Sequence, residues 1–309
     1  MNGESAGSNV VVGVDGAAPA LRATAWAALT AMRRRRPLLL VAAMSPPTPY
    51  GTGIGLRPDH FVELEGEGRM WLDRARSVAE RVGGPADIGT ELVVGAASSA
   101  LAERAEHASC VAIGGHERRQ GGLGSVAADL MGRVPCPVAV VRWRGEADFP
   151  PANGAVVVGV DGSPASAEAV VVAYEEAALR EAPLVAVHAT SERRGLLHRR
   201  GEGVWGEGDV AEALTLAERL AGMREWYPQV EVERVLAKEQ PAAALARHGE
   251  TAQLLVVGST GHGEVSGRLL GSTSHALARS APCPLLVVPG RTRTRTEENR
   301  SRRREKTGP

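Results

Sequence analysis

Cysteine and aromatic residues are scarce in this sequence. Among its 309 residues there are 3 cysteines, Cys110, Cys136 and Cys283, and aromatic residues make up 3%. Three cysteines cannot form a disulfide framework, and none lies in a pattern with the spacing of zinc ligands. A core with so few aromatic rings must be built from Val, Leu, Ile and Ala. We therefore expect a protein of the reducing cytoplasm that has no structural metal.

Net charge and long apolar runs are also missing. The 36 Lys and Arg residues balance the 36 Asp and Glu residues, so the formal net charge is zero. Nucleic-acid-binding proteins usually carry a basic excess, and a membrane-spanning helix needs about 20 apolar residues. The polar start, MNGESAGSN, lacks the apolar core of a signal peptide. These absences argue against nucleic-acid and membrane partners.

The sequence repeats itself. VVVGVDG begins at residue 10 and again at residue 156, which is 146 positions later. VPCPVAVV begins at residue 134, and APCPLLVV follows at residue 281, which is 147 positions later. Two echoes at nearly one offset indicate a tandem duplication. Because the segment between them is rich in Pro and Gly, we expect domains at 9–145 and 155–290 with a linker at 146–154.

Strand and helix patterns alternate in both halves. The openings are continuous β-branched runs, typical of strands that are covered on both faces. This order predicts an α/β fold of two tandem doubly wound domains, each a parallel sheet with flanking helices. Periodicity alone leaves the order of the strands open. The expected strands are 10–14, 38–43, 90–94, 110–114, 138–142, 156–160, 184–189, 231–236, 253–258 and 284–288. The expected helices are 18–33, 61–82, 97–107, 125–133, 164–180, 208–225, 240–249 and 272–280.

The two ends of the chain differ from this body. Residues 291–309 are rich in arginine and hold no apolar residue for packing, so we expect them to be disordered. The polar residues 1–8 are expected to be disordered as well. A basic tail can contact nucleic acid or anionic lipid, but we favour the interpretation of a solubilising terminus.

A glycine-rich segment, GSTGHGEVSGRLLGS, runs from Gly258 to Ser272 between an expected strand and an expected helix. Without a Cβ, Gly258, Gly261 and Gly271 can bring backbone N–H groups close to an anion and adopt positive φ. Ser272 or Thr273 can cap the helix, whose N-terminus attracts anions. In open α/β sheets, ligands bind at the carboxyl ends of the strands. The segment therefore predicts a phosphate site without lysine.

The spacing G-x2-G-x9-G-S in this segment resembles the ATP-binding signature of the universal stress protein family. The resemblance includes the VVVGVDG openings and the closings that contain PCP, so the sequence is identified as a tandem member of the type common in actinobacteria. It implies five-stranded parallel sheets of order 3-2-1-4-5 and pairing of the halves through their last strands. It also implies ATP as cofactor, with Mg²⁺ as an additional candidate between the phosphates.

The resemblance assigns residues of the second half to this ligand. Asp161 would bind the ribose or the base, because a carboxylate accepts hydrogen bonds from hydroxyls; a turn-forming Asp-Gly pair is the alternative interpretation. Ala189, with His188, would lie beside adenine, although His188 can instead simply pack. The expected phosphate-binding residues are Gly258, Gly261, Gly271, Ser272 and Thr273.

The first half departs from the pattern. Gly114 and Gly124 are ten positions apart, whereas Gly258 and Gly271 are thirteen apart. Glu117 stands where the loop glycine belongs, and a carboxylate that faces phosphates costs Coulomb energy, although the next two residues are arginines that could compensate. We expect nucleotide mainly in the second half. The first-half candidates are Asp15, Gly114, Gly124 and Ser125.

These observations favour a cytoplasmic nucleotide-binding stress regulator over an efficient enzyme. No general base or arginine finger is evident, so no catalytic residue is assigned. A slow ATPase or phosphotransferase and a nucleotide-free scaffold are the alternatives. We also expect a regulatory protein partner, and a homodimer remains an option beside pairing within the chain.

Overall fold

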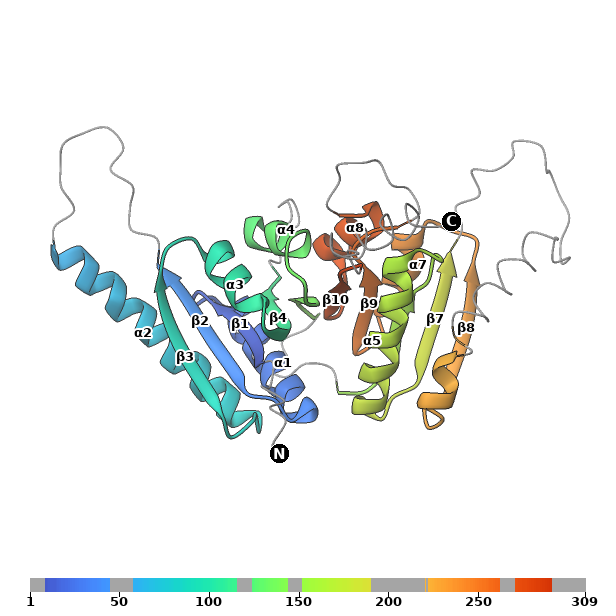
Figure 1. The fold of residues 1–309 in the computed structure, drawn as a ribbon, viewed down its shortest axis with the longest axis horizontal. Helices are drawn as coiled ribbons and strands as arrows, with labels where there is room; N and C mark the ends of the chain where they lie inside the picture. Colours follow the sequence, from blue (N-terminus) through green and yellow to red (C-terminus); the bar gives the residue numbers. More distant parts are fainter. Residues whose placement is uncertain are drawn as a thin grey trace, which may run out of the picture.

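The computed structural model in Figure 1 describes residues 9–44, 58–115, 124–143, 152–189, 220, 222–261 and 270–290. The first half contains β1 (Asn9–Val14), α1 (Ala18–Arg34), β2 (Leu38–Met44), α2 (Pro58–Arg81), β3 (Ile88–Val94), α3 (Ala97–Ala105), β4 (Ala108–Gly114), α4 (Ser125–Met131) and β5 (Val138–Val141). The second half contains β6 (Val156–Gly159), α5 (Pro164–Arg180), β7 (Leu184–Ala189), β8 (Val232–Ala237), α7 (Pro241–Gly249), β9 (Leu254–Gly258), α8 (Ser272–Ser280) and β10 (Leu285–Val288).

The expected strands and helices are confirmed wherever they fall on described residues. Of the helix expected at 208–225, only residues 220 and 222–225 are described, and all of these are helical. The expectations for 1–8 and 291–309 lie outside the described residues, as does most of the proposed linker.

One mixed sheet joins both halves of the chain. Its strand order is β3-β2-β1-β4-β5-β10-β9-β6-β7-β8, so the described strands of each half follow 3-2-1-4-5. Neighbouring strands are parallel within each half, whereas β5 and β10 are antiparallel, with Leu286 opposite Ala139. Figure 1 shows the halves on either side of this junction. The halves therefore pair within the chain through their last strands, as the resemblance implied.

Helices cover both faces of the sheet. Val10 and Val12 of β1 pack in a core with residues of α1, α2 and α5, whereas Val11 packs on the opposite face with residues of α3, α4, α7 and α8. This alternation follows from the period of two in a strand. It explains why the openings are apolar at successive positions and confirms the α/β fold class.

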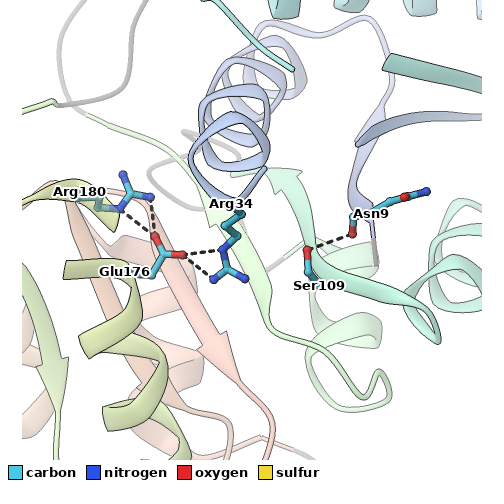
Figure 2. A network of polar contacts seen from close by, with 5 residues as sticks. All are labelled: Asn9, Arg34, Ser109, Glu176 and Arg180. Carbon is cyan, nitrogen blue, oxygen red and sulfur yellow. Dashed lines mark hydrogen bonds and ion pairs between the residues drawn. The ribbon is translucent and has the colours of Figure 1, made fainter. Parts of the chain in front are cut away.

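A buried ion cluster also links the halves (Figure 2). Glu176 of α5 accepts hydrogen bonds from Arg34 of α1, at 3.1 Å from Nε and 2.6 Å from Nη2, and from Arg180 Nε at 2.9 Å. Arg34 and Arg180 are equivalent positions, 146 residues apart, but the equivalent of Glu176 is Thr30. One carboxylate therefore holds both arginines. Figure 2 also shows Ser109 Oγ donating to the carbonyl of Asn9 at 3.2 Å.

Candidate functional site

A cavity of about 250 Å³ lies at the carboxyl ends of β6, β7 and β9. Its walls come from these strand ends, from the start of α7 and from the N-terminal turn of α8. The structure brings together here the residues that the sequence predicted for the second half, with the exception of His188. They are Asp161, Ala189, Gly258, Gly261, Gly271, Ser272 and Thr273. What they bind stays a prediction.

Asp161 stands two residues beyond the end of β6. Its Oδ1 accepts the N–H of Ser163 at 2.9 Å, and Gly162 has a positive φ of 83°, so the residue does form a turn. The same carboxylate is exposed and lines the cavity. A Cβ on Gly261 would lie 2.7 Å from Asp161 Oδ2, so the absence of a side chain at Gly261 leaves room for the carboxylate.

The three glycines of the glycine-rich segment have a different structural role from the one that we expected. None of Gly258, Gly261 and Gly271 has positive φ. A Cβ on Gly258 would meet the backbone of Ala165 at 2.7 Å, so this glycine is needed for close packing of α5 on β9. The N–H of Gly271 already donates to the carbonyl of Ser259 at 2.7 Å. The expected left-handed conformation is therefore wrong, and the Gly271 N–H is not a phosphate donor here.

The start of α8 supplies the donors that face the cavity. Gly271 is the N-cap, and no side chain caps the helix, so the expected cap by Ser272 or Thr273 is wrong. Ser274 Oγ donates to the carbonyl of Gly258 at 2.6 Å and ties α8 to β9. The first N–H groups of an α-helix have no intrahelical acceptor. Those of Ser272 and Thr273 therefore remain as anion donors at the rim.

The opposite wall of this cavity is apolar. It is formed by Val187 and Ala189 of β7 and by Pro241 and Leu245 of α7. His188 Nδ1 lies 2.7 Å from the carbonyl oxygen of Val160, so the imidazole is held by the backbone of the neighbouring strand. The packing interpretation of His188 therefore fits the structure better than contact with adenine.

A cavity of about 460 Å³ occupies the equivalent place in the first half. We call it the first cavity, and the cavity of the second half the second cavity. Asp15 Oδ1 accepts the N–H of Ala17 at 3.0 Å, as Asp161 does with Ser163. The first-half candidates Asp15, Gly114, Gly124 and Ser125 all line the first cavity. Glu117 and the two arginines that follow it lie outside the described residues.

Two arginines of this first cavity were missed by the sequence analysis. Arg142 follows β5, and Arg279 comes from α8 of the other half. Arg142 Nη2 donates to the carbonyl of Ala278 at 2.7 Å, and burial lowers the pKa of Arg142. Helix α8 therefore lines the second cavity with Ser272 and Thr273 and the first cavity with Arg279. When the two halves are aligned, Arg142 stands opposite Pro289, and this difference in sequence could have pointed to Arg142.

The described part of the chain contains no group of three or more His, Cys, Asp or Glu side chains arranged to hold a metal ion. Nor does any helix within it combine the length and apolar character needed to cross a membrane.

Comparison with known proteins gives consistent matches over both halves. The model of the universal stress protein family matches residues 8–142 and 153–289. A universal stress protein of Mycobacterium tuberculosis is 35% identical over 295 residues, covering 93% of this chain and 98% of that protein. One of Mycobacterium bovis is 38% identical over 291 residues, covering 90% and 96%. A crystal structure of a universal stress protein from Archaeoglobus fulgidus has a TM-score of 0.66 at 19% identity and covers 91% of this chain and 96% of its own.

Proposed function

Because this chain belongs to the universal stress protein family, we propose that it is a cytoplasmic regulatory protein that binds ATP in the cavity of its second half. The domain limits 9–145 and 155–290 are part of this proposal. Bound ATP would order the rim of the cavity and change the surface offered to a regulatory protein partner, which requires different affinities for the two states.

The observation that carries the proposal is the convergence of three kinds of group on one cavity. The Asp161 carboxylate can accept hydrogen bonds from ribose hydroxyls or from the base. The apolar wall around Val187 and Ala189 suits the adenine ring. The N–H groups and hydroxyls of Ser272 and Thr273 lie at the start of α8, where the helix favours phosphate.

The lining of this cavity favours binding over rapid phosphoryl transfer. Among its described residues, Asp161 is the only ionisable one. An efficient phosphotransferase needs a cation on the transferred phosphate and a group that orients the nucleophile. With one carboxylate available among the described residues, Mg²⁺ would be bound mainly by the phosphates themselves. A slow ATPase remains the second candidate function.

Calorimetric titration with ATP tests the proposal. Asp161→Ala should weaken ATP binding about tenfold, since hydrogen bonds to charged groups contribute about 1.5–3 kcal/mol. Asp73→Ala, on the exposed surface of α2, is the control and should have no effect. If Asp15→Ala weakens binding while Asp161→Ala and Gly261→Ala do not, the preference for the second half is wrong.

The alternatives need separate measurements. ATP turnover well above background that is lost in Gly271→Ala would favour the slow ATPase. Mass spectrometry of the denatured protein detects any co-purified adenine nucleotide. If no nucleotide is released and ATP causes no thermal shift, the nucleotide-free scaffold is the better function.

A further inference from the structure

We propose that the first cavity is an anion site completed by the opposite half of the chain, in which Arg142 and Arg279 together bind the phosphate chain of a nucleotide. The proposal rests on the proposed function only in taking a nucleotide as the ligand class. The site itself is separate from the second cavity and is built from different side chains.

Arg142 is a desolvated cation beside this cavity. Its guanidinium packs over Gly115, where a Cβ would lie 2.5 Å from Nε. Its Nη2 donates to the Ala278 carbonyl, but the buried Nε has no acceptor, and no carboxylate of a described residue pairs with the side chain. A buried guanidinium that has no counter-ion among the described residues is costly. An anion in the cavity would supply a counter-ion for this charge.

Arg279 brings a second cation from across the junction. It is exposed, lies in the last turn of α8, and makes no ion pair with a described residue. The ionisable residues among the described lining are Asp15, Arg142 and Arg279, so this lining carries a net positive charge. The described lining of the second cavity holds a single carboxylate. The described linings of the two cavities therefore carry opposite charge.

This difference is specific to the first half. At the offset of 147 residues, Arg142 corresponds to Pro289 and Arg279 corresponds to Gly132. Neither Pro nor Gly carries a charge, so neither arginine has a cation at the equivalent position of the other half. The walls around Val41 and Leu101 remain apolar and suit a base. The volume of the first cavity, about 460 Å³, leaves room for a nucleotide.

The decisive comparison removes the two cations from the full chain. The Arg142→Gln/Arg279→Ala double variant keeps a hydrogen-bond donor near the Ala278 carbonyl. The control is Arg133→Ala/Arg247→Ala, which removes two arginines from exposed ion pairs and changes the net charge by the same amount. ATP, adenosine and tripolyphosphate are titrated by calorimetry. Crosslinking with 8-azido-ATP, followed by mass spectrometry of the labelled peptides, assigns binding to a half.

We expect two ATP molecules per chain and labelling in both halves. In the double variant, ATP affinity at the first half should fall at least about tenfold, while adenosine affinity and second-half labelling stay unchanged. Tripolyphosphate that binds the first half in an arginine-dependent manner would support the anion site and identify the phosphate chain as the recognised part. Arg142→Lys should retain most of the ATP affinity, because it keeps the charge.

Four outcomes would overturn the inference. Labelling confined to the second half would refute it and leave the proposed function standing. Unchanged ATP affinity at the first half in the double variant would do the same. If Arg142→Lys loses as much ATP affinity at the first half as Arg142→Gln, the charge of residue 142 does not contribute to binding and the inference fails. Absence of any nucleotide binding would refute both proposals together.

Discussion

At the scale of single residues, carboxylates were easier to interpret than glycines. Asp15 and Asp161 end equivalent strands, accept a backbone N–H two residues later and line equivalent cavities. Their placement follows from local sequence. The need for Gly258 comes from a helix distant in sequence, because Ala165 lies against it. A glycine pattern marks such a site without revealing why each glycine is required.

Gly258→Ala should therefore destabilise the fold, because the added methyl would overlap the backbone of α5. We expect a loss of about 1–3 kcal/mol in the free energy of unfolding, as for other overpacked cores. Gly66→Ala is the control, since nothing lies within 4 Å of its Cβ position in α2, and it should stabilise by up to about 1 kcal/mol. Urea denaturation of both variants tests this, and equal stabilities would contradict the packing argument.

The cysteines should be unreactive in the folded protein. Cys110, Cys136 and Cys283 are buried and free, and burial raises the pKa of both Cys136 and Cys283 to about 12. Since the thiolate is the reactive form, both stay protonated at neutral pH. Ellman's reagent at pH 8 should detect no thiol in the native protein and 3 after denaturation. Rapid reaction without denaturant would show that the core opens readily.

At the scale of elements, strands and helices were predictable because each has its own hydrophobic periodicity in the local sequence. The reach of α8 into the first cavity was not, because it depends on how the halves pair. Arg279 shares a cavity with Asp15 only because β5 and β10 are neighbours in the sheet. A site formed between halves therefore escapes a search that treats each half by itself.

The hydroxyl of Ser274 should hold α8 in place on β9. Ser274→Ala removes its buried 2.6 Å hydrogen bond and leaves the Gly258 carbonyl without that donor. We expect a loss of about 1–3 kcal/mol and faster hydrogen exchange in α8. Ser280→Ala, at the exposed end of the same helix, is the control and should change little. Equal exchange rates in the two variants would argue against this role.

At the scale of the whole molecule, the junction is asymmetric although the fold is a repeat. Arg34 and Arg180 occupy equivalent places, yet both bind Glu176, and Arg180 also lies over the ring of Trp26 at 5.8 Å. Two copies of the first half would bring Arg34 near Arg34 with only Thr30 between them. The cluster therefore disfavours pairing of two first halves.

Glu176 should make stability depend on acid. Burial raises the pKa of this carboxyl, but Arg180 and Arg34 outweigh burial and lower it below the ordinary 4.5. Its contribution is therefore present above about pH 4.5 and is lost as the pH falls through the lower pKa of the folded state. Glu176→Gln should cost about 3–5 kcal/mol at pH 7, because it leaves two buried cations.

Denaturation measured from pH 3 to pH 7 checks both parts of this expectation. The variant should show a smaller loss of stability below pH 4.5 than the unchanged protein. Glu65→Gln, which breaks an exposed pair with Arg69, should cost less than about 1 kcal/mol. Parallel pH profiles for Glu176→Gln and the unchanged protein would rule out Glu176 as the source.

Helix α8 is nine residues long and has one end in each cavity. Ligands in the two cavities would therefore contact opposite ends of the same short helix. If a ligand in the first cavity changes the affinity of the second cavity by some factor, thermodynamic linkage requires that a ligand in the second cavity change the affinity of the first by the same factor. Ligands in the two halves would in this way influence each other through a single helix.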